Sequence, residues 1–177
     1  MSRRDPYGTH TEPRSPKVPA LAVRITDGMK RKGLHIRCKH THPEVKEAII
    51  LFAKWLRKKQ IFPIRVPVYV SAREKILTRK GQECFALFFE PFSETEEPFI
   101  KIATEDYKQE KAKRGKYSAI AAILCSLAHE VIHYLNWCKR RQSSEKRVSE
   151  NAKLMTLRYL HAVKNPRATS SAKSKGL

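Results

Sequence analysis

The motif His-Glu-Val-Ile-His at positions 129–133 constrains this chain more than any other feature of the sequence. On an α-helix, residues four apart lie on one face, so His129 and His133 can direct imidazole nitrogens at one metal ion. Glu130 lies about 100° around the helix, where it can reach a metal-bound water without binding the metal. Such a site suits Zn²⁺, which binds neutral imidazole at ~2.0–2.1 Å and keeps a position for water beside three protein ligands.

The residues around the motif indicate a buried helix. Positions 119–135 read AIAAILCSLAHEVIHYL and are apolar around almost the whole circumference, which is typical of a core helix. The alternative is a core helix that carries two histidines by chance, but burying these polar groups without partners would cost several kcal/mol. A metal ion and its water would satisfy them, so the sequence predicts a metal site. Cys125 shares the face of His129 and is expected to be a buried thiol that lines the site.

Charge is the second strong feature. The 177 residues include 37 Lys and Arg against 17 Asp and Glu, which gives a net charge of +20 and predicts attraction to nucleic acid or another polyanion. We expect much of this charge to lie in tails and linkers rather than on one folded face. Residues 1–20 and 164–177 are expected to be disordered tails that bind nucleic acid non-specifically. Residues 21–163 are long enough for one domain with a core.

Nothing in the sequence indicates a secretory or membrane protein. The first twenty residues are basic but lack the apolar core of a signal peptide. The apolar run around the motif is interrupted by Ser126, His129 and Glu130, so no membrane span is predicted. We therefore expect a cytoplasmic protein. The four cysteines show no Cys-x-x-Cys spacing and indicate free thiols.

The first predicted helix spans 42–60. A Thr-x-x-Glu capping box formed by Thr41 and Glu44 precedes its apolar stripe, and Pro43 lies in its first turn. Residues 38–42, Cys-Lys-His-Thr-His, also resemble a small ligand cluster. We interpret them as a strand end followed by a helix cap rather than a second metal site.

Short β-type runs follow this helix. Residues 64–70, 84–89 and 99–103 are predicted strands, residues 34–38 are an edge strand, and residues 21–25 are a short strand or a loop. Together they predict a small, mostly antiparallel sheet of three or four strands.

The last third of the chain is predicted to be helical. Residues 104–117 are highly charged and read as a linker or a flexible lobe. Ser118 is the expected N-cap of the motif helix, which runs to about residue 140. Ser144 can cap a final helix over about 145–163.

The order of helix, small sheet, His-Glu-x-x-His helix, turn and glutamate-bearing helix resembles the minimal gluzincin-type metallopeptidases, including ImmA/IrrE-like and related phage-borne proteins. The resemblance covers residues 42–163 and is sharpest in HEVIHYLNW followed by SSEKRVSENAKLM. It implies an α+β, zincin-like fold, in which a small sheet packs on an N-terminal helix, the motif helix and a C-terminal glutamate helix. It also implies a Zn²⁺ cofactor, a protein or peptide substrate, and a substrate backbone bound along strand 99–103.

The resemblance further implies that His129, His133 and a glutamate of the next helix bind zinc, with Glu130 as the general base. Glu150 is the preferred third ligand and Glu145 the runner-up. His133 lies nine residues before the turn at 142 and Glu150 eight after it, so antiparallel helices would place them at similar heights. SprT-like proteins share the motif but use a third histidine, and the only downstream histidine, His161, ranks below the glutamates.

Two questions stay open in the sequence. The residue that stabilises the oxyanion is a tyrosine by type only, with Tyr117, Tyr134 and Tyr159 as candidates, although Tyr134 is expected to pack. The alternative function is a basic nucleic-acid-binding protein whose metal site is structural or degenerate.

Overall fold

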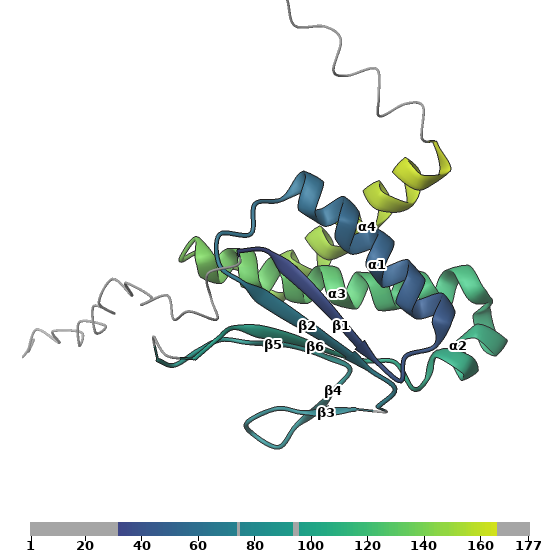
Figure 1. The fold of residues 1–177 in the computed structure, drawn as a ribbon, viewed down its shortest axis with the longest axis horizontal. Coiled ribbons are helices and arrows are strands. Elements are labelled where there is room, and N and C mark those ends of the chain that lie inside the picture. Colours follow the sequence, from purple (N-terminus) through teal and green to yellow (C-terminus); the bar gives the residue numbers. More distant parts are fainter. Residues whose placement is uncertain (1–31, 74, 94–95, 166–177) are drawn as a thin grey trace, which may run out of the picture.

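The computed structural model describes residues 32–73, 75–93 and 96–165. The predictions for both tails and for residues 21–25 fall outside these residues. Four helices and two small sheets make up the described part (Figure 1). The strands are β1 (Leu34–Lys39), β2 (Val66–Ser71), β3 (Ile76–Leu77), β4 (Glu83–Cys84), β5 (Ala86–Phe89) and β6 (Phe99–Ala103). The helices are α1 (Pro43–Lys59), α2 (Tyr107–Arg114), α3 (Lys116–Cys138) and α4 (Glu145–Lys164). The α+β class is therefore confirmed.

The main sheet has the strand order β1–β2–β6–β5 and is mixed, so the prediction of a mostly antiparallel sheet is wrong. Strand β1 pairs with β2 in parallel, β2 pairs with β6 in parallel, and only β5 runs antiparallel, against β6. The parallel arrangement follows from α1, which crosses over between β1 and β2, since parallel strands need a long connection of this kind. Strands β3 and β4 form a separate antiparallel pair.

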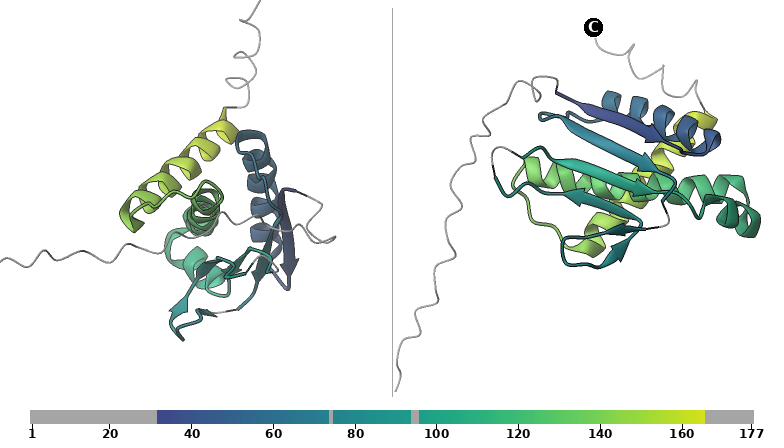
Figure 2. Two further views of the ribbon diagram at one scale, coloured as in Figure 1. Left: turned by 90° about the vertical axis from the view of Figure 1, so that its left-hand side faces the viewer. Right: turned by 60° about the horizontal axis from the view of Figure 1, so that its bottom comes forward.

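The four helices of the described residues lie on one face of the main sheet, and no described helix covers the opposite face (Figure 2). Alternate residues of the strands point into the helical layer. Val66, Val68 and Val70 of β2 are fully buried there, as are Ile100 and Ile102 of β6. The apolar stripe predicted for the first helix is also buried and packs in the same core.

The predicted capping box of α1 is wrong. His42 is the N-cap, and its ring nitrogen accepts a hydrogen bond of 3.3 Å from the N–H of Glu44. The hydroxyl of Thr41 donates instead to the carbonyl of Val70 at 3.2 Å. The Glu44 carboxylate points to α2, where it accepts a 2.5 Å hydrogen bond from the Tyr107 hydroxyl. The interpretation of residues 38–42 as a strand end and a cap is confirmed, because β1 ends at Lys39.

The stretch predicted as a linker or flexible lobe contains α2. Tyr107 is 1% exposed and anchors this helix to the core. Gly115 ends α2 with a φ of 83°, a conformation that glycine adopts without steric cost, and α3 then begins at Lys116 rather than after Ser118.

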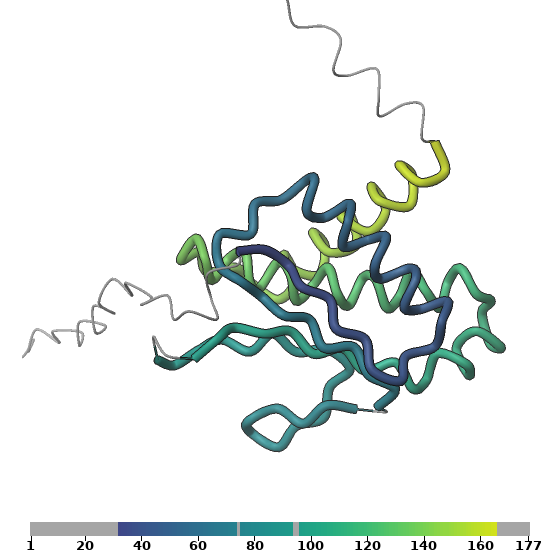
Figure 3. The backbone as a smooth tube through the Cα atoms, viewed as in Figure 1, coloured from purple at the N-terminus to yellow at the C-terminus, as the bar shows by residue number. Residues whose placement is uncertain are grey.

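Helix α3 is the centre of the fold. Among the described residues it is the one helix long and apolar enough in composition to cross a membrane, contrary to the expectation of none. Ten of its residues are buried against the sheet and the other helices, as in the core helix of a globular domain. Helix α4 packs on α3 and crosses it obliquely, as the chain trace also shows (Figure 3).

Candidate metal centre

The two motif histidines lie one helical turn apart on α3, as the sequence predicts. Their Nε2 atoms are 3.0 Å apart, and both side chains are partly buried. Burial lowers the pKa of His133, and the nearby Glu145 carboxylate opposes this shift. The direction favours the neutral imidazole, which is the form that binds metal ions.

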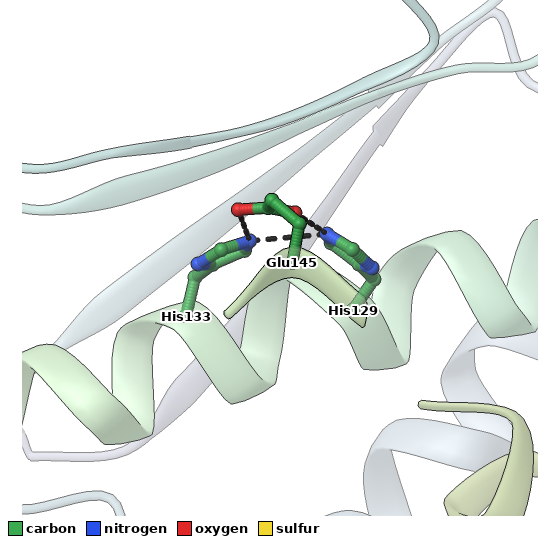
Figure 4. A group of neighbouring side chains, drawn as sticks. All are labelled: His129, His133 and Glu145. Carbon is green, nitrogen blue, oxygen red and sulfur yellow. Dashed lines mark hydrogen bonds and ion pairs between the residues drawn. The ribbon is translucent and has the colours of Figure 1, made fainter. Parts of the chain in front are cut away.

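The carboxylate of Glu145 spans the two histidines (Figure 4). One of its oxygens lies 3.3 Å from Nε2 of His129, and the other lies 3.4 Å from Nε2 of His133. Two ligands bound at ~2.0–2.1 Å in a tetrahedral site would lie about 3.3 Å apart. The three side chains can therefore offer ligand atoms that all lie within 4.8 Å of one another, and among the described residues they form the one group of this kind.

The structure brings Glu145, the runner-up, to the two histidines, and it does not bring Glu150 there. Both glutamates are exposed, but Glu145, the first residue of α4, belongs to the cluster and Glu150 lies outside it. Five residues turn a helix by about 500°, so the two side chains leave α4 in different directions.

The preference for Glu150 assumed two antiparallel helices joined by a tight turn, and the structure differs from that assumption. Helix α3 ends at Cys138, and residues 141–144 form an irregular connection to α4. An extended residue advances ~3.3 Å against ~1.5 Å in a helix, so a short connection can return to the level of the histidines. Glu145 then meets the site from the first turn of α4. His161 lies near the opposite end of α4 and contacts Asn165, which agrees with its low ranking.

Glu130 is held beside the histidines by the sheet. Glu130 is 8% exposed, and one of its carboxylate oxygens accepts a 2.6 Å hydrogen bond from the N–H of Phe88 in β5. Burial raises the pKa of Glu130 to about 7, the Phe88 hydrogen bond opposes the shift, and the Glu145 charge adds to it. A carboxyl group with a pKa near neutrality is suited to proton transfer.

Strand β5 forms the edge of the sheet next to the motif helix. The N–H of Ala103 donates to the carbonyl of Phe85. In an antiparallel pair the hydrogen-bonded residues alternate, so the backbone N–H and C=O groups of Leu87 and Phe89 also face β6. Those of Ala86 and Phe88 therefore face outwards, towards α3. Strand 99–103, expected to bind substrate, has neighbours on both sides, so that expectation is wrong; among the described strands, β5 is the edge strand on this side of the sheet.

A cavity of about 400 Å³ adjoins the site. His129, Glu130 and Ala86 line it, as do Cys125 of α3, Ser149 and Lys153 of α4. The position of Cys125 agrees with the prediction of a thiol lining the site, and all four cysteines are free.

The sequence analysis missed Ser149 and Lys153. The Ser149 hydroxyl lies 3.5 Å from Nδ1 of His129, the ring nitrogen that faces away from the cluster. Both residues could have been found from their spacing in the sequence. Ser149 and Lys153 lie four and eight residues after Glu145, and residues at this spacing lie on one face of a helix.

None of the three tyrosines proposed for the oxyanion lines this cavity. Tyr134 is fully buried, and its hydroxyl bonds to the backbone of Ile64, so the expectation that it packs is confirmed. Tyr159 packs against Phe52, and Tyr117 is exposed at the start of α3.

No protein-family model matches this chain, and no curated protein or solved structure matches it at a significant level.

Proposed function

We propose that this protein is a zinc-dependent metallopeptidase of the zincin type. The observation that carries the proposal is the Glu145 carboxylate spanning His129 and His133, one oxygen near each ring, with Glu130 next to them on the same helix. Two imidazoles and one carboxylate are a ligand set of catalytic zinc sites, which keep a fourth position for water or substrate.

His129, His133 and Glu145 would hold the zinc ion. Bound zinc lowers the pKa of its water towards 7 and polarises a scissile carbonyl. Ser149 orients the His129 ring from its other nitrogen, the role that hydrogen-bonding partners of metal-binding histidines commonly have.

Glu130 would act as the general base and then as the general acid. Its carboxylate accepts the proton of the attacking water and returns it to the leaving amine. The hydrogen bond from Phe88 holds one oxygen, and among the described residues the other oxygen makes no hydrogen bond to protein. That second oxygen is the one available for proton transfer.

The free edge of β5 would bind the substrate as an added strand. The backbone groups of Ala86 and the carbonyl of Phe88 face this edge, while the Phe88 N–H already donates to Glu130, and Ala86 lines the same cavity as Glu130. Backbone pairing of this kind holds an extended peptide largely independently of its side chains. Lys153 is the cationic side chain at the cavity and is our candidate for stabilising the oxyanion.

The test compares the full chain with its Glu130→Gln and His129→Ala variants. Zinc is measured by elemental mass spectrometry, and cleavage is measured on a mixed peptide library. We expect one zinc in the wild type and in Glu130→Gln, no stoichiometric zinc in His129→Ala, and cleavage reduced by roughly 10²–10⁴-fold in Glu130→Gln. Absence of zinc from the wild type after zinc addition, or wild-type cleavage by Glu130→Gln, would contradict the proposal.

The alternative is a nucleic-acid-binding protein with a structural or degenerate metal site. It predicts that no peptide is cleaved, whether or not the metal is bound, and that nucleic-acid binding is the activity of the purified chain. The net charge of +20 is the observation that favours it.

A further inference from the structure

The face of the main sheet that carries no helix has its own chemistry. Arg37, Tyr69, Lys101 and Leu87 are register partners across β1, β2, β6 and β5, so they form one row across this face. The first three are exposed, while their neighbours in the strands are mostly buried in the core. We call this surface the open face.

Aromatic and cationic side chains alternate over the open face. The guanidinium of Arg37 lies 5.8 Å from the centre of the Tyr69 ring, and Tyr69 meets Phe99 edge to face at 6.1 Å. Phe99 stacks on Phe89 at 4.4 Å with an interplanar angle of 7°. The row continues beyond the sheet, where Arg79 lies 4.1 Å from the ring centre of Phe89 and from that of Phe92. Phe92 is 80% exposed and Tyr69 is 39% exposed, so rings are accessible along the row.

A groove of about 890 Å³ is lined by residues of the open face and of β3. Figure 3 shows the β3–β4 segment on the side of the main sheet away from the helices. The lining of the groove holds a concentration of positive charge and no described carboxylate. The basic residues in the lining are Arg37, Lys39, Arg73, Lys75 and Lys101, with His40 beside them.

Two carboxylates lie at this surface, where Glu83 pairs with Lys75 and Glu96 with Arg79. Other carboxylates of the domain are engaged elsewhere. Glu44 binds Lys111 and Lys116, Glu97 binds Arg65, and Glu110 binds Arg114. Arg37, Lys39, Arg73 and Lys101 make no ion pair with a described carboxylate within 4.0 Å. Their charge is therefore available to a polyanion.

We propose that the open face binds single-stranded nucleic acid. Phosphates would lie along the basic lining of the groove, and unpaired bases would stack on Tyr69 and the phenylalanines next to it. Basic grooves interleaved with exposed aromatic rings bind single strands in this way, because every base has a face that can stack. A duplex would satisfy the charges but would keep its bases stacked inside, away from Tyr69. An acidic protein would likewise leave the aromatic row without a specific partner.

This surface is separate from the metal centre. The histidines and Glu130 belong to α3, which packs on the opposite face of the sheet (Figure 2). Nucleic-acid binding should therefore be independent of catalysis, and Glu130→Gln should bind a single strand as tightly as the wild type.

The test measures fluorescence anisotropy with a labelled oligothymidine of about 16 nucleotides, its RNA counterpart and a duplex of equal length. The full chain is used throughout, so the basic termini contribute equally to every variant. We expect Tyr69→Ala to weaken single-strand binding by about fivefold or more and to leave duplex binding unchanged, while Tyr69→Phe retains affinity. The double change Arg37→Ala with Lys101→Ala should reduce the slope of log affinity against log salt by about 1.4.

Two exposed residues away from the open face provide matched controls. Tyr117→Ala removes an aromatic ring that is 87% exposed at the start of α3, and Lys58→Ala removes an exposed charge on α1. Single-strand affinity unchanged in Tyr69→Ala, or lost equally in Tyr69→Ala and Tyr117→Ala, would overturn the proposal.

A second measurement does not depend on the folding of any variant. Photo-crosslinking of an oligonucleotide containing 5-iodouracil to the wild type, mapped by mass spectrometry, should label Tyr69, Phe99 or Phe92. Crosslinks confined to residues 1–20 and 164–177 would show that only the terminal segments bind, and the proposal would fail.

Discussion

The backbone N–H of Phe88 donates a hydrogen bond of 2.6 Å to the carboxylate of Glu130, joining the sheet edge to the motif helix. The two residues lie 42 positions apart in the sequence. Because this N–H faces the free edge of β5, the strand proposed to bind the substrate also fixes the proposed base. The position of the base and the path of the substrate are thereby set by one element.

The first prediction concerns this hydrogen bond. Phe88→Pro removes the N–H at an edge position where proline can be tolerated, and Phe88→Ala removes the side chain but keeps the N–H. A hydrogen bond to a charged group contributes ~1.5–3 kcal/mol, so kcat should fall about tenfold or more in Phe88→Pro relative to Phe88→Ala. Both variants lose the ring that packs against Tyr134 and Trp137, so the difference between them isolates the N–H. Equal kcat values in the two variants would show that the hydrogen bond does not position Glu130 for catalysis.

The second prediction concerns the third zinc ligand. Glu145→Ala should lose stoichiometric zinc, whereas Glu150→Ala should retain it, because only Glu145 reaches the two histidines. Competition with a chromogenic chelator measures both affinities. Loss of zinc in Glu150→Ala alone would restore the assignment made from the sequence.

The histidine pair could be predicted because its geometry is local. A spacing of four positions on one helix fixes the relative position of His129 and His133, independently of the rest of the fold. Glu145 could not be assigned in this way, because its position depends on the irregular connection at 141–144 and on the oblique crossing of α3 and α4. Counting residues from the turn treats this connection as helical and therefore selects Glu150.

The positions of the main-sheet strands were predictable, but their pairing was not, and the pair β3–β4 was not predicted: the run at 84–89 covers the end of β4 as well as β5. The apolar runs at 64–70, 84–89 and 99–103 overlap β2, β5 and β6. The crossover through α1 and the antiparallel pairing of β5 with β6 decide which strand lies at the edge. Both are features of the tertiary structure that local sequence patterns do not determine. The expected substrate strand was therefore placed on β6 instead of its neighbour β5.

The third prediction concerns stability in acid. Hydrogen bonds from Lys111, Lys116 and the Tyr107 hydroxyl lower the pKa of Glu44 from 4.5 to about 2. A depressed folded-state pKa means that the stabilisation is present above pH 4.5 and is lost as the pH falls towards 2. Glu44→Gln should therefore lower the thermal midpoint at pH 7 and flatten its decline over this acid range. Melting curves recorded by circular dichroism measure both effects, with the exposed Glu150→Gln as the control. A decline as steep as in the wild type would show that Glu44 does not link α1 to α2 in solution.

The last prediction separates packing from catalysis at Tyr134. Its hydroxyl donates to the carbonyl of Ile64 at 2.6 Å and accepts from the N–H of Ile64 at 3.1 Å, and burial raises the pKa of Tyr134 far above its ordinary value. Tyr134→Phe leaves both backbone groups of Ile64 without this partner, so the free energy of unfolding should fall by about 1–3 kcal/mol. Cleavage per folded molecule should stay at the wild-type level, because the hydroxyl points to the segment before β2 rather than into the cavity at Glu130. Urea unfolding and kcat are measured on the same preparations, with the exposed Tyr117→Phe expected within about 0.5 kcal/mol of the wild type. If kcat fell while stability held, Tyr134 would act in the reaction and the packing role would be wrong.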